Sequence, residues 1–302
     1  MKNQNIKNQF KKITMWKRSG VRSPHKPLMV LYAIGCLLRN KERLISYEEI
    51  DKDVAKLLQD FGPQRKSYHP EYPFWRLQKD GIWEIEHFEK LNLKLNKSGD
   101  IKKKDLIENR IHGGFKKHIY QNLVDNQMMI KKIIQEMLED NFPQTIHEDI
   151  LQAVGIDINL MDNSVKTRSP NFRDKILRAY DYRCAICGFD VRMGHFPVAL
   201  EAAHIKWHNA GGPDTEINGL ALCSLHHKLF DRGAYTVSND LIILVSNRAN
   251  GTEGFKEWLM KFHGKKLRLP QRTTYSPDQA YTDWHVREVF QGEFREVVNE
   301  YG

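Results

Sequence analysis

Two patterns of apolar and polar positions predict helices in the first third of the chain. A nearly unbroken apolar run follows His25-Lys-Pro-Leu, and Pro27 fits the first turn of a helix, where its missing N–H costs nothing. Further on, Ser46-Tyr-Glu-Glu49 has the form of a capping box, in which both side chains satisfy backbone N–H groups. We therefore expect one helix from His25 and a second from Ser46 to about Phe61.

The segments that follow predict strands and then a long helix. Residues 72–78 and 81–86 are rich in aromatic side chains and are joined by Lys79-Asp-Gly81, a sequence typical of a hairpin turn. The break at Gly113-Gly114 then opens an amphipathic stretch that reaches about Asp140. The first half is thus expected to be a mixed α/β module, and the whole chain an α+β protein.

A short polar patch predicts the boundary between two domains. The patch covers residues 163–170 and follows an apolar-periodic segment at about 144–160. A chain of 302 residues is long enough for two domains with cores of their own. We expect a first domain at 1–150, a linker region at 151–170 and a second domain with a C-terminal extension at 171–302.

Charge is divided unevenly between the two halves. Residues 1–150 contain 28 Lys and Arg against 20 Asp and Glu, whereas residues 151–302 contain 19 against 18. A basic surplus favours contact with the phosphates of nucleic acids, so we expect the first half to hold duplex DNA. The sequence has no apolar run of about 18 residues and no apolar secretion signal at its Lys-rich start, so we expect a cytoplasmic protein without a membrane partner.

Four residues of the second half are spaced like the ligands of one structural zinc ion. Cys184 and Cys187 form one pair, and Cys223 and His226 form a second pair with the same spacing. Tetrahedral zinc sites commonly take two such pairs, and two pairs are much more specific than one. The remaining cysteine, Cys36, lies in an apolar run and is expected to pack in a core.

Three further residues lie within this zinc frame, and a structural zinc ion does not need them. His204 stands at a predicted strand end, where a neutral imidazole can take a proton from water. Asn218 is expected at the start of the helix that carries Cys223, and His227 further along it. Because His226 and His227 both fall near the Cys223 face of that helix, helix geometry alone does not decide which of them binds zinc.

This combination of motifs resembles the HNH endonuclease superfamily over about residues 172–245. That family has a ββα-metal fold with a general-base histidine, a loop-orienting asparagine and a histidine that binds a catalytic cation. The resemblance assigns these roles to His204, Asn218 and His227, respectively. It also gives His226 to zinc, because the second pair of zinc ligands in the family is followed directly by the catalytic histidine.

One departure from the family leaves the carboxylate ligand of the catalytic cation open. Many relatives carry an acidic residue or a histidine just before the base, and this chain has Ala203 there. Glu201 and Asp231 are the candidates, each with a capping or solvating role as the alternative. Asp214, in the same region, is expected to be a surface or loop residue.

The reaction implied by the resemblance is phosphodiester hydrolysis assisted by one divalent cation. His204 would deprotonate water for in-line attack on phosphorus. Mg²⁺ or Mn²⁺ held by His227 would stabilise the charge of the transition state and of the departing oxygen.

Two motifs of the first half, Ser23-Pro-His-Lys-Pro-Leu28 and Pro70-Glu-Tyr-Pro-Phe-Trp-Arg-Leu77, carry a second resemblance. They are similar to the sulfur-binding domain that precedes the HNH domain in phosphorothioate-dependent restriction endonucleases, over about residues 10–140. In that family an apolar pocket surrounds the sulfur that replaces a phosphate oxygen, and basic groups contact the neighbouring backbone. The resemblance places Tyr72, Pro73 and Phe74 near the sulfur, and Arg22, His25, Lys26 and Arg76 on the DNA. It does not locate the basic loop contacts of the family, and the run Lys102, Lys103 and Lys104 is the candidate for them.

Three functions fit these features. The first is a type IV-like restriction endonuclease that recognises phosphorothioate-modified DNA. The second is an HNH endonuclease that reads methylated or unmodified DNA. The third is a non-catalytic zinc module that binds DNA, and the presence of both His204 and His227 argues against it. We expect a dimer on DNA, because a double-strand break needs two active sites.

Overall fold

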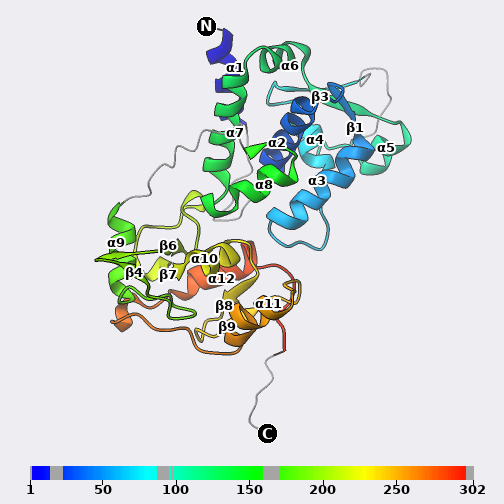
Figure 1. The fold of residues 1–302 in the computed structure, drawn as a ribbon. Coiled ribbons are helices and arrows are strands. Elements are labelled where there is room, and N and C mark those ends of the chain that lie inside the picture. The colour runs from blue at the N-terminus through cyan, green and yellow to red at the C-terminus, as the bar shows by residue number, and fades with distance from the viewer. Residues whose placement is uncertain (1, 14–22, 87–94, 97, 159–169, 297–302) are drawn as a thin grey trace. The chain divides into compact units, whose positions relative to one another are not determined.

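The chain divides into two compact units, Met1–Asn163 and Ser164–Gly302, in the computed structural model (Figure 1). The structure describes residues 2–13, 23–86, 95–96, 98–158 and 170–296. Among the helices of these ranges, none is long and apolar enough to cross a membrane.

The N-terminal unit packs helices around a small antiparallel sheet with the strand order β1–β3–β2 (Figure 1). The strands are β1 (Leu44–Ser46), β2 (Trp83–Ile85) and β3 (His112–Phe115). The helices are α1 (Lys2–Lys11), α2 (His25–Leu38), α3 (Tyr47–Phe61), α4 (Glu71–Arg76), α5 (Lys103–Glu108), α6 (Lys117–Val124), α7 (Gln127–Asn141) and α8 (His147–Ala153). Helix α2 is buried along almost its whole length and contacts α3, α4 and α7, as expected for a helix that is apolar on all sides.

Both helix starts predicted from the sequence are confirmed. Helix α2 begins at His25 with Pro27 in its first turn. Helix α3 runs from Tyr47 to Phe61, and the Ser46 hydroxyl accepts a hydrogen bond from the backbone N–H of Glu49 at 3.2 Å. The capping signal therefore located the start of this helix correctly, and the predicted end at about Phe61 is also confirmed.

The predicted hairpin over residues 72–86 is wrong. Its first half is helix α4, in which Pro73 occupies the first turn and so removes no helical hydrogen bond. Its second half is strand β2, which pairs with β3 and not with the preceding segment. The sequence of a short apolar run does not distinguish a buried helix from a strand, and residues 71–76 form a buried helix.

The glycine pair at 113–114 was predicted to open a long helix, and this prediction is wrong. Both glycines lie in the central strand β3. A Cβ on Gly113 would lie 2.6 Å from the Phe74 ring, and one on Gly114 would lie 1.9 Å from the carbonyl oxygen of Arg43. The strand can therefore pack this closely only without side chains at these positions. The amphipathic stretch that follows is also split, because Asn126 caps a new helix, α7.

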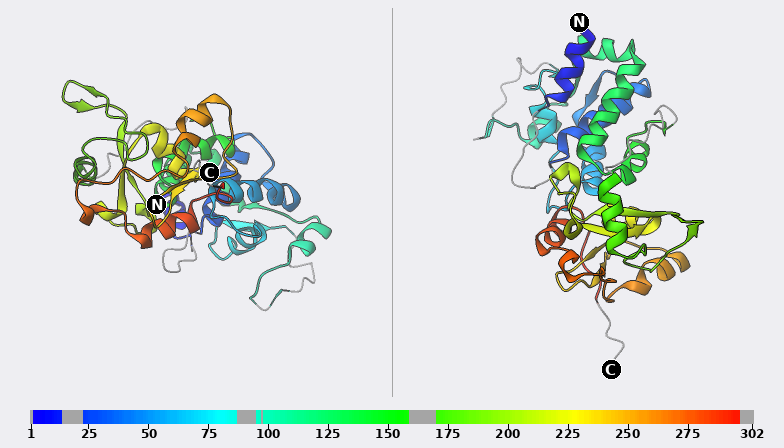
Figure 2. Two further views of the ribbon diagram at one scale, coloured as in Figure 1. Left: turned by 90° about the horizontal axis from the view of Figure 1, so that it is seen from below. Right: turned by 90° about the vertical axis from the view of Figure 1, so that its left-hand side faces the viewer.

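The C-terminal unit is built from two-stranded sheets and short helices (Figures 1 and 2). Its strands are β4 (Arg192–Met193), β5 (Phe196–Pro197), β6 (Leu200–His204), β7 (Gly219–Cys223), β8 (Tyr235–Val237) and β9 (Ile243–Val245). Its helices are α9 (Pro170–Ala179), α10 (Ser224–Asp231), α11 (Glu253–Trp258) and α12 (Gln279–Glu288).

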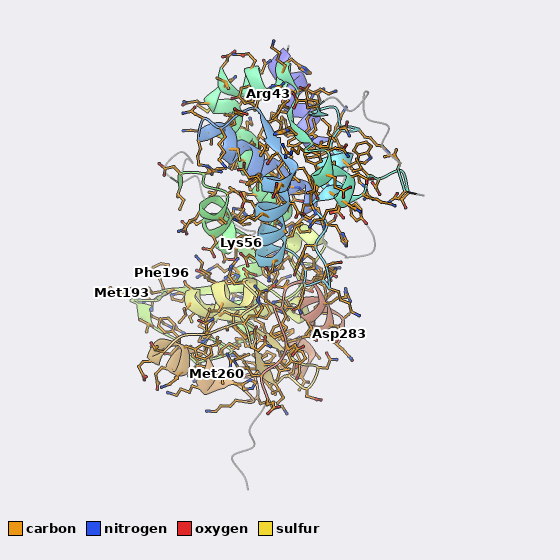
Figure 3. The ribbon with its side chains drawn as sticks, turned by 90° about the vertical axis from the view of Figure 1, so that its right-hand side faces the viewer. Arg43, Lys56, Met193, Phe196, Met260 and Asp283 are labelled. Carbon is orange, nitrogen blue, oxygen red and sulfur yellow. The ribbon has the colours of Figure 1, made fainter. Side chains whose placement is uncertain are left out.

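The antiparallel pair β6–β7 and the helix α10 form the predicted ββα arrangement, which is confirmed. His204 pairs with Gly219 and Leu200 with Cys223, so β7 leads directly from the turn before Gly219 into α10. Helices α9 and α10 both contact this strand pair. The neighbouring β4–β5 hairpin carries the exposed side chains of Met193 and Phe196 (Figure 3).

Candidate active site and DNA-binding residues

The cysteine and histidine pairs come together in one cluster. The four potential ligand atoms, from Cys184, Cys187, Cys223 and His226, lie within 4.8 Å of one another. The first pair stands in the loop after α9, and the second spans the end of β7 and the first turn of α10. A Cys₃His set of this compactness fits a tetrahedral zinc ion, so the cluster could hold the structural metal.

The surroundings of His226 prepare it to act as a zinc ligand. Its Nε2–H donates to the carbonyl oxygen of Trp258 at 2.9 Å, which fixes the tautomer with the lone pair on Nδ1. That Nδ1 lies 3.1 Å from the sulfur of Cys223 and 3.7 Å from that of Cys184. Hydrogen bonds from Cys187 and Cys223 hold the pKa of Cys184 far below its usual value, so this thiol favours the thiolate form that binds zinc.

His204 ends strand β6, and its ring is held by two neighbours. The imidazole stacks on Phe172 of α9 with ring centroids 3.9 Å apart and an angle of 10° between the ring planes. Its Nε2 lies 2.8 Å from Oδ1 of Asp214. Asp214 is exposed, as predicted, but it also contacts the candidate base, and this contact was not predicted.

Asn218 does not start the helix that carries Cys223, contrary to the prediction. It ends a 3₁₀ turn, Glu216–Asn218, immediately before β7, and α10 begins only at Ser224. Its fully buried amide accepts from the backbone N–H of Lys206 at 2.8 Å and donates to the carbonyl oxygens of Lys206 and Pro213 at 3.0 Å each. One side chain thus joins the two ends of the loop that follows His204.

His227 turns away from the cysteine cluster and contacts two carboxylates. Nδ1 lies 2.6 Å from Oε2 of Glu201, and Nε2 lies 3.2 Å from Oδ2 of Asp231. The Glu201 carboxylate also accepts a hydrogen bond from the Ser224 hydroxyl at 2.7 Å. Exposure distinguishes the two acids, because the Glu201 side chain is 41% exposed and that of Asp231 only 2%.

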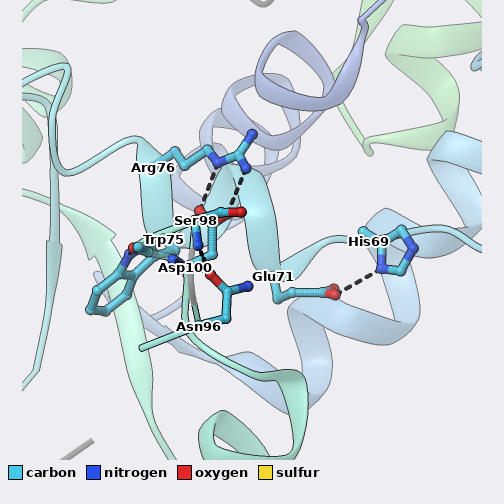
Figure 4. Close-up of polar contacts among 8 residues, drawn as sticks. His69, Glu71, Trp75, Arg76, Asn96, Ser98 and Asp100 are labelled. Carbon is cyan, nitrogen blue, oxygen red and sulfur yellow. Dashed lines mark hydrogen bonds and ion pairs between the residues drawn. The ribbon is translucent and has the colours of Figure 1, made fainter. Parts of the chain in front are cut away.

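In the N-terminal unit, Tyr72 contacts two residues with basic side chains. Its ring stacks on His69 with a centroid distance of 5.0 Å, and the guanidinium of Arg76 lies 4.8 Å from its centroid. His69 also bonds through Nδ1 to Glu71 at 2.8 Å (Figure 4). His69 lies two residues before α4, and Tyr72 and Arg76, at positions i and i+4, are neighbours on one face of that helix.

Arg76 is anchored by the segment that precedes α5. Its guanidinium makes two hydrogen bonds to the Asp100 carboxylate, at 2.8 and 2.6 Å, and holds the pKa of that carboxyl below its usual value (Figure 4). The indole N–H of Trp75 donates to the carbonyl oxygen of Gly99 at 2.8 Å. These contacts fix the direction of Arg76, which is 42% exposed in its side chain.

The remaining predicted DNA-binding residues lie in different environments. Pro73 and Phe74 are buried, and Phe74 packs against Tyr47 and Trp83 in the core. The Lys26 ammonium lies 2.6 Å from Asp80, with both side chains largely buried. Lys102, Lys103 and Lys104 are exposed, and Lys103 and Lys104 pair with Asp51 and Glu108, respectively. Arg22 lies outside the described residues.

His25 is partly buried near three basic groups. Burial lowers its pKa to about 4, and the positive charges of His69, Arg65 and Arg76 act in the same direction. The imidazole is therefore neutral at pH 7. The guanidinium groups of Arg65 and Arg76 are near this end of α2, where an anionic ligand would reduce their repulsion.

Sequence reasoning missed three residues of these sites: His69, Asp100 and Asp214. The i, i+4 spacing of Tyr72 and Arg76 would have indicated a shared helix face, but the segment from residue 72 was predicted as a strand. Asp214 follows a glycine pair that signals a tight turn beside His204. Asp100 had no signal in the sequence that tied it to Arg76.

Comparison with known families matches both halves of the chain. The family described as ScoMcrA-like, DNA sulfur-binding domain matches residues 3–159, more than half of the 302 residues. The HNH endonuclease family, HNH_2, matches residues 184–238. Both resemblances predicted from the sequence are thereby confirmed, and the second half is a nuclease domain.

One similar solved structure is the sulfur binding domain of ScoMcrA complexed with phosphorothioated DNA. The two chains are 21% identical, the match covers 52% of this chain and 98% of that chain, and the TM-score is 0.46. The sulfur binding domain of SprMcrA complexed with phosphorothioated DNA has 18% identity over 51% and 94%, with a TM-score of 0.43. The modification dependent TagI restriction endonuclease has 27% identity over 44% and 41%, with a TM-score of 0.28. No curated protein matches the chain.

The family assignment rests on the match over residues 3–159, and the nuclease assignment rests on the match over 184–238 together with the ββα arrangement around His204 and His227. The chain belongs to the ScoMcrA-like DNA sulfur-binding domain family and carries an HNH endonuclease domain in its second half.

Proposed function

We propose that this protein is a restriction endonuclease that reads phosphorothioate-modified duplex DNA with about residues 1–150 and hydrolyses phosphodiester bonds with residues 171–302, after a linker region at 151–170. The observation that carries the proposal is the presence in one chain of a DNA sulfur-binding domain and an HNH domain. In that HNH domain His204 and His227 each lie within hydrogen-bonding distance of a carboxylate, which supports their proposed roles. Two copies would be needed to break both strands, so we propose a dimer on DNA.

His204 is the proposed general base. Its position at a strand end and its stacking on Phe172 fix the imidazole, and 10% of its side chain remains exposed. A positioned base of this kind accelerates hydrolysis by about 10²- to 10⁴-fold. Asn218 contributes by holding the loop after His204 in one conformation.

Glu201 and His227 are the residues that would hold the catalytic cation. Glu201 and Asp231 contact opposite ring nitrogens of His227, so the two acids are not expected to share one ion with that ring. The half-exposed Glu201 is on the side that a substrate can reach, and it precedes Ala203 by two residues on the same face of β6. Many relatives carry a metal-binding residue at the position of Ala203. In this chain Glu201 is the proposed replacement, and buried Asp231 is proposed to orient the imidazole of His227.

The carboxylate of this donor pair suits Mg²⁺ or Mn²⁺. When bound, such an ion stabilises the charge of the phosphate and of the leaving oxygen. The Cys₃His cluster, with four protein ligands and no open position, is the proposed structural zinc site.

Sulfur recognition is proposed for Tyr72 and Pro73, with Phe74 packing behind them in the core. A phosphorothioate sulfur is larger and less strongly hydrated than a phosphate oxygen, so an apolar surface accepts it at a lower desolvation cost. A difference of this kind corresponds to a preference of roughly 10²-fold. His25, Lys26, Arg76 and the lysines at 102–104 are the proposed contacts to the DNA backbone.

The experiment that tests this proposal separates binding from cutting. The full chain with His204→Ala is titrated with two duplexes of one sequence, with and without a phosphorothioate linkage, at a fixed salt concentration. We expect a clear preference for the modified duplex, and its reduction by Tyr72→Ala. Tyr120→Ala, on the separate helix α6, is the matched control and should keep the preference.

Equal affinity for both duplexes would contradict sulfur reading. The nuclease would then read another modification or plain sequence.

A further inference from the structure

The Asp214 carboxylate contacts the candidate base at one edge of its ring. Its Oδ1 lies 2.8 Å from Nε2 of His204, and a carboxylate at that distance can only accept the imidazole N–H. We propose that Asp214 is the positioning residue of the general base, because it fixes the tautomer and the direction of the His204 ring. This inference rests on the proposed role of His204 in the cleavage reaction.

Stacking alone does not fix the ring of His204. The Phe172 ring, nearly parallel at 10°, keeps the imidazole in one plane but permits rotation within that plane. A hydrogen bond at the ring edge removes this remaining freedom. The two contacts come from separate elements, α9 and the loop after β6, and together they define where each nitrogen lies.

The loop that carries Asp214 is tied to His204 through Asn218. The Asn218 amide bonds both the N–H and the C=O of Lys206, two residues after the base, and the C=O of Pro213, just before Asp214. This buried side chain, together with the backbone hydrogen bond from Gly212 to Trp207, therefore helps to set the distance between the base and its carboxylate. Asn218 acts on the base through the backbone of the residue next to Asp214.

Gly212 shows that this loop is closely packed. A Cβ at this position would lie 1.8 Å from the carbonyl oxygen of Lys206 and 2.8 Å from Nδ2 of Asn218. Only glycine leaves room for the contact between the two ends of the loop. The preceding Gly211 has a φ of 82°, which also favours glycine. The local sequence is thus suited to bringing Asp214 back onto the base.

The contact has a defined chemical consequence. With Nε2–H donated to Asp214, the lone pair lies on Nδ1, and that atom takes the proton from the attacking water. The resulting hydroxide forms the new P–O bond while the bond from phosphorus to the 3′ oxygen breaks. The Asp214 carboxylate stabilises the imidazolium that forms and does not itself take the proton.

The test is the pH dependence of single-turnover cleavage of a phosphorothioate duplex by the full-length protein with Mn²⁺. Asp214→Asn should lower the maximal rate by about 10- to 100-fold. It should also move the acid limb of the profile to lower pH, because the imidazolium loses its carboxylate. Asp214→Glu, which keeps the charge, should recover part of the rate and of the limb position. Glu216→Gln, in the same loop, is the control and should match the wild type.

Binding and thermal unfolding, measured on the same variants, separate positioning from a structural role. We expect DNA affinity and melting temperature close to wild-type values, because Asp214 is exposed. A wild-type rate for Asp214→Asn, or a lower rate with an unmoved acid limb, would overturn the inference. Wild-type cleavage by His204→Ala would instead refute the proposed base. An inactive His204→Ala beside a fully active Asp214→Asn would refute this inference alone.

Discussion

Two acids beside His227 differ in burial, and the roles that we propose for them rest on that difference. Glu201 is within 2.6 Å of Nδ1 and half-exposed, whereas Asp231 is within 3.2 Å of Nε2 and almost fully buried. A ligand of a catalytic cation must be accessible to substrate and solvent, while a residue that orients the ligand does not. Sequence alone left both acids as candidates, because their exposure depends on how α10 packs on β6.

Glu201→Gln and Asp231→Ala should therefore have different effects. Glu201→Gln should raise the Mg²⁺ concentration for half-maximal cleavage by about 10- to 100-fold with little change in melting temperature. Asp231→Ala should lower the free energy of unfolding by about 1–3 kcal/mol, because it removes a buried acceptor. Metal titration of the cleavage rate and thermal unfolding are the measurements. A larger shift of metal demand in Asp231→Ala than in Glu201→Gln would contradict the assignment.

His25 provides a prediction on stability and pH. An unfolded histidine titrates near pH 6.5, and burial beside His69, Arg65 and Arg76 lowers the pKa of His25 to about 4. Between these values only the unfolded chain takes up this proton, so stability falls as the pH decreases from about 6.5 to 4. His25→Gln should reduce the loss of melting temperature between pH 7 and pH 5. An unchanged loss would show that His25 is not neutral in the folded protein.

At the scale of elements, sequence signals correctly predicted helix starts that depend on contacts within a single turn. The capping box at Ser46 and the proline at Pro27 each gave a correct helix start, since both act within one turn. Helix α4 and strand β3 could not be predicted in this way. Their conformation depends on Phe74 packing on Gly113, two positions far apart in the sequence.

The same contrast holds for the site. The spacings of the zinc pairs and of His204, Asn218 and His227 were visible in the sequence, because family motifs preserve them. The contacts of Asp214 with His204 and of Asp100 with Arg76 were not visible, because loop conformation alone brings these carboxylates into place. Asn218 was predicted at the start of a helix, but it lies immediately before β7. Its position also depends on the conformation of the loop after His204, which the sequence does not reveal.

The Cys₃His cluster joins the loop after α9 to β7 and α10, so loss of the proposed zinc ion should destabilise the ββα unit. Cys184→Ser or Cys223→Ser should lower zinc content and melting temperature together, because structural zinc contributes folding free energy. Cys36→Ala, in the core of the N-terminal unit, is the control and should keep the zinc. Elemental analysis with calorimetry is the measurement, and a wild-type protein with far less than one zinc per chain would refute the site.

At the scale of the whole molecule, the protein combines a basic first half with a second half of nearly balanced charge. This division agrees with the family matches, which place DNA sulfur binding in residues 3–159 and the nuclease in residues 184–238. Phosphate contacts by the first half would hold any duplex, and the sulfur-reading residues would then select the modified one. Both functions are required for cleavage that depends on modification.

The most direct test compares two plasmids of identical sequence, one with phosphorothioate linkages and one without. Each is incubated with purified full-length protein and Mg²⁺ or Mn²⁺, and linear product is followed on a gel, with His204→Ala as the inactive control. The account predicts linear product from the modified plasmid with the wild-type protein only, and none from the unmodified plasmid. Equal cutting of both plasmids by the wild type would contradict it.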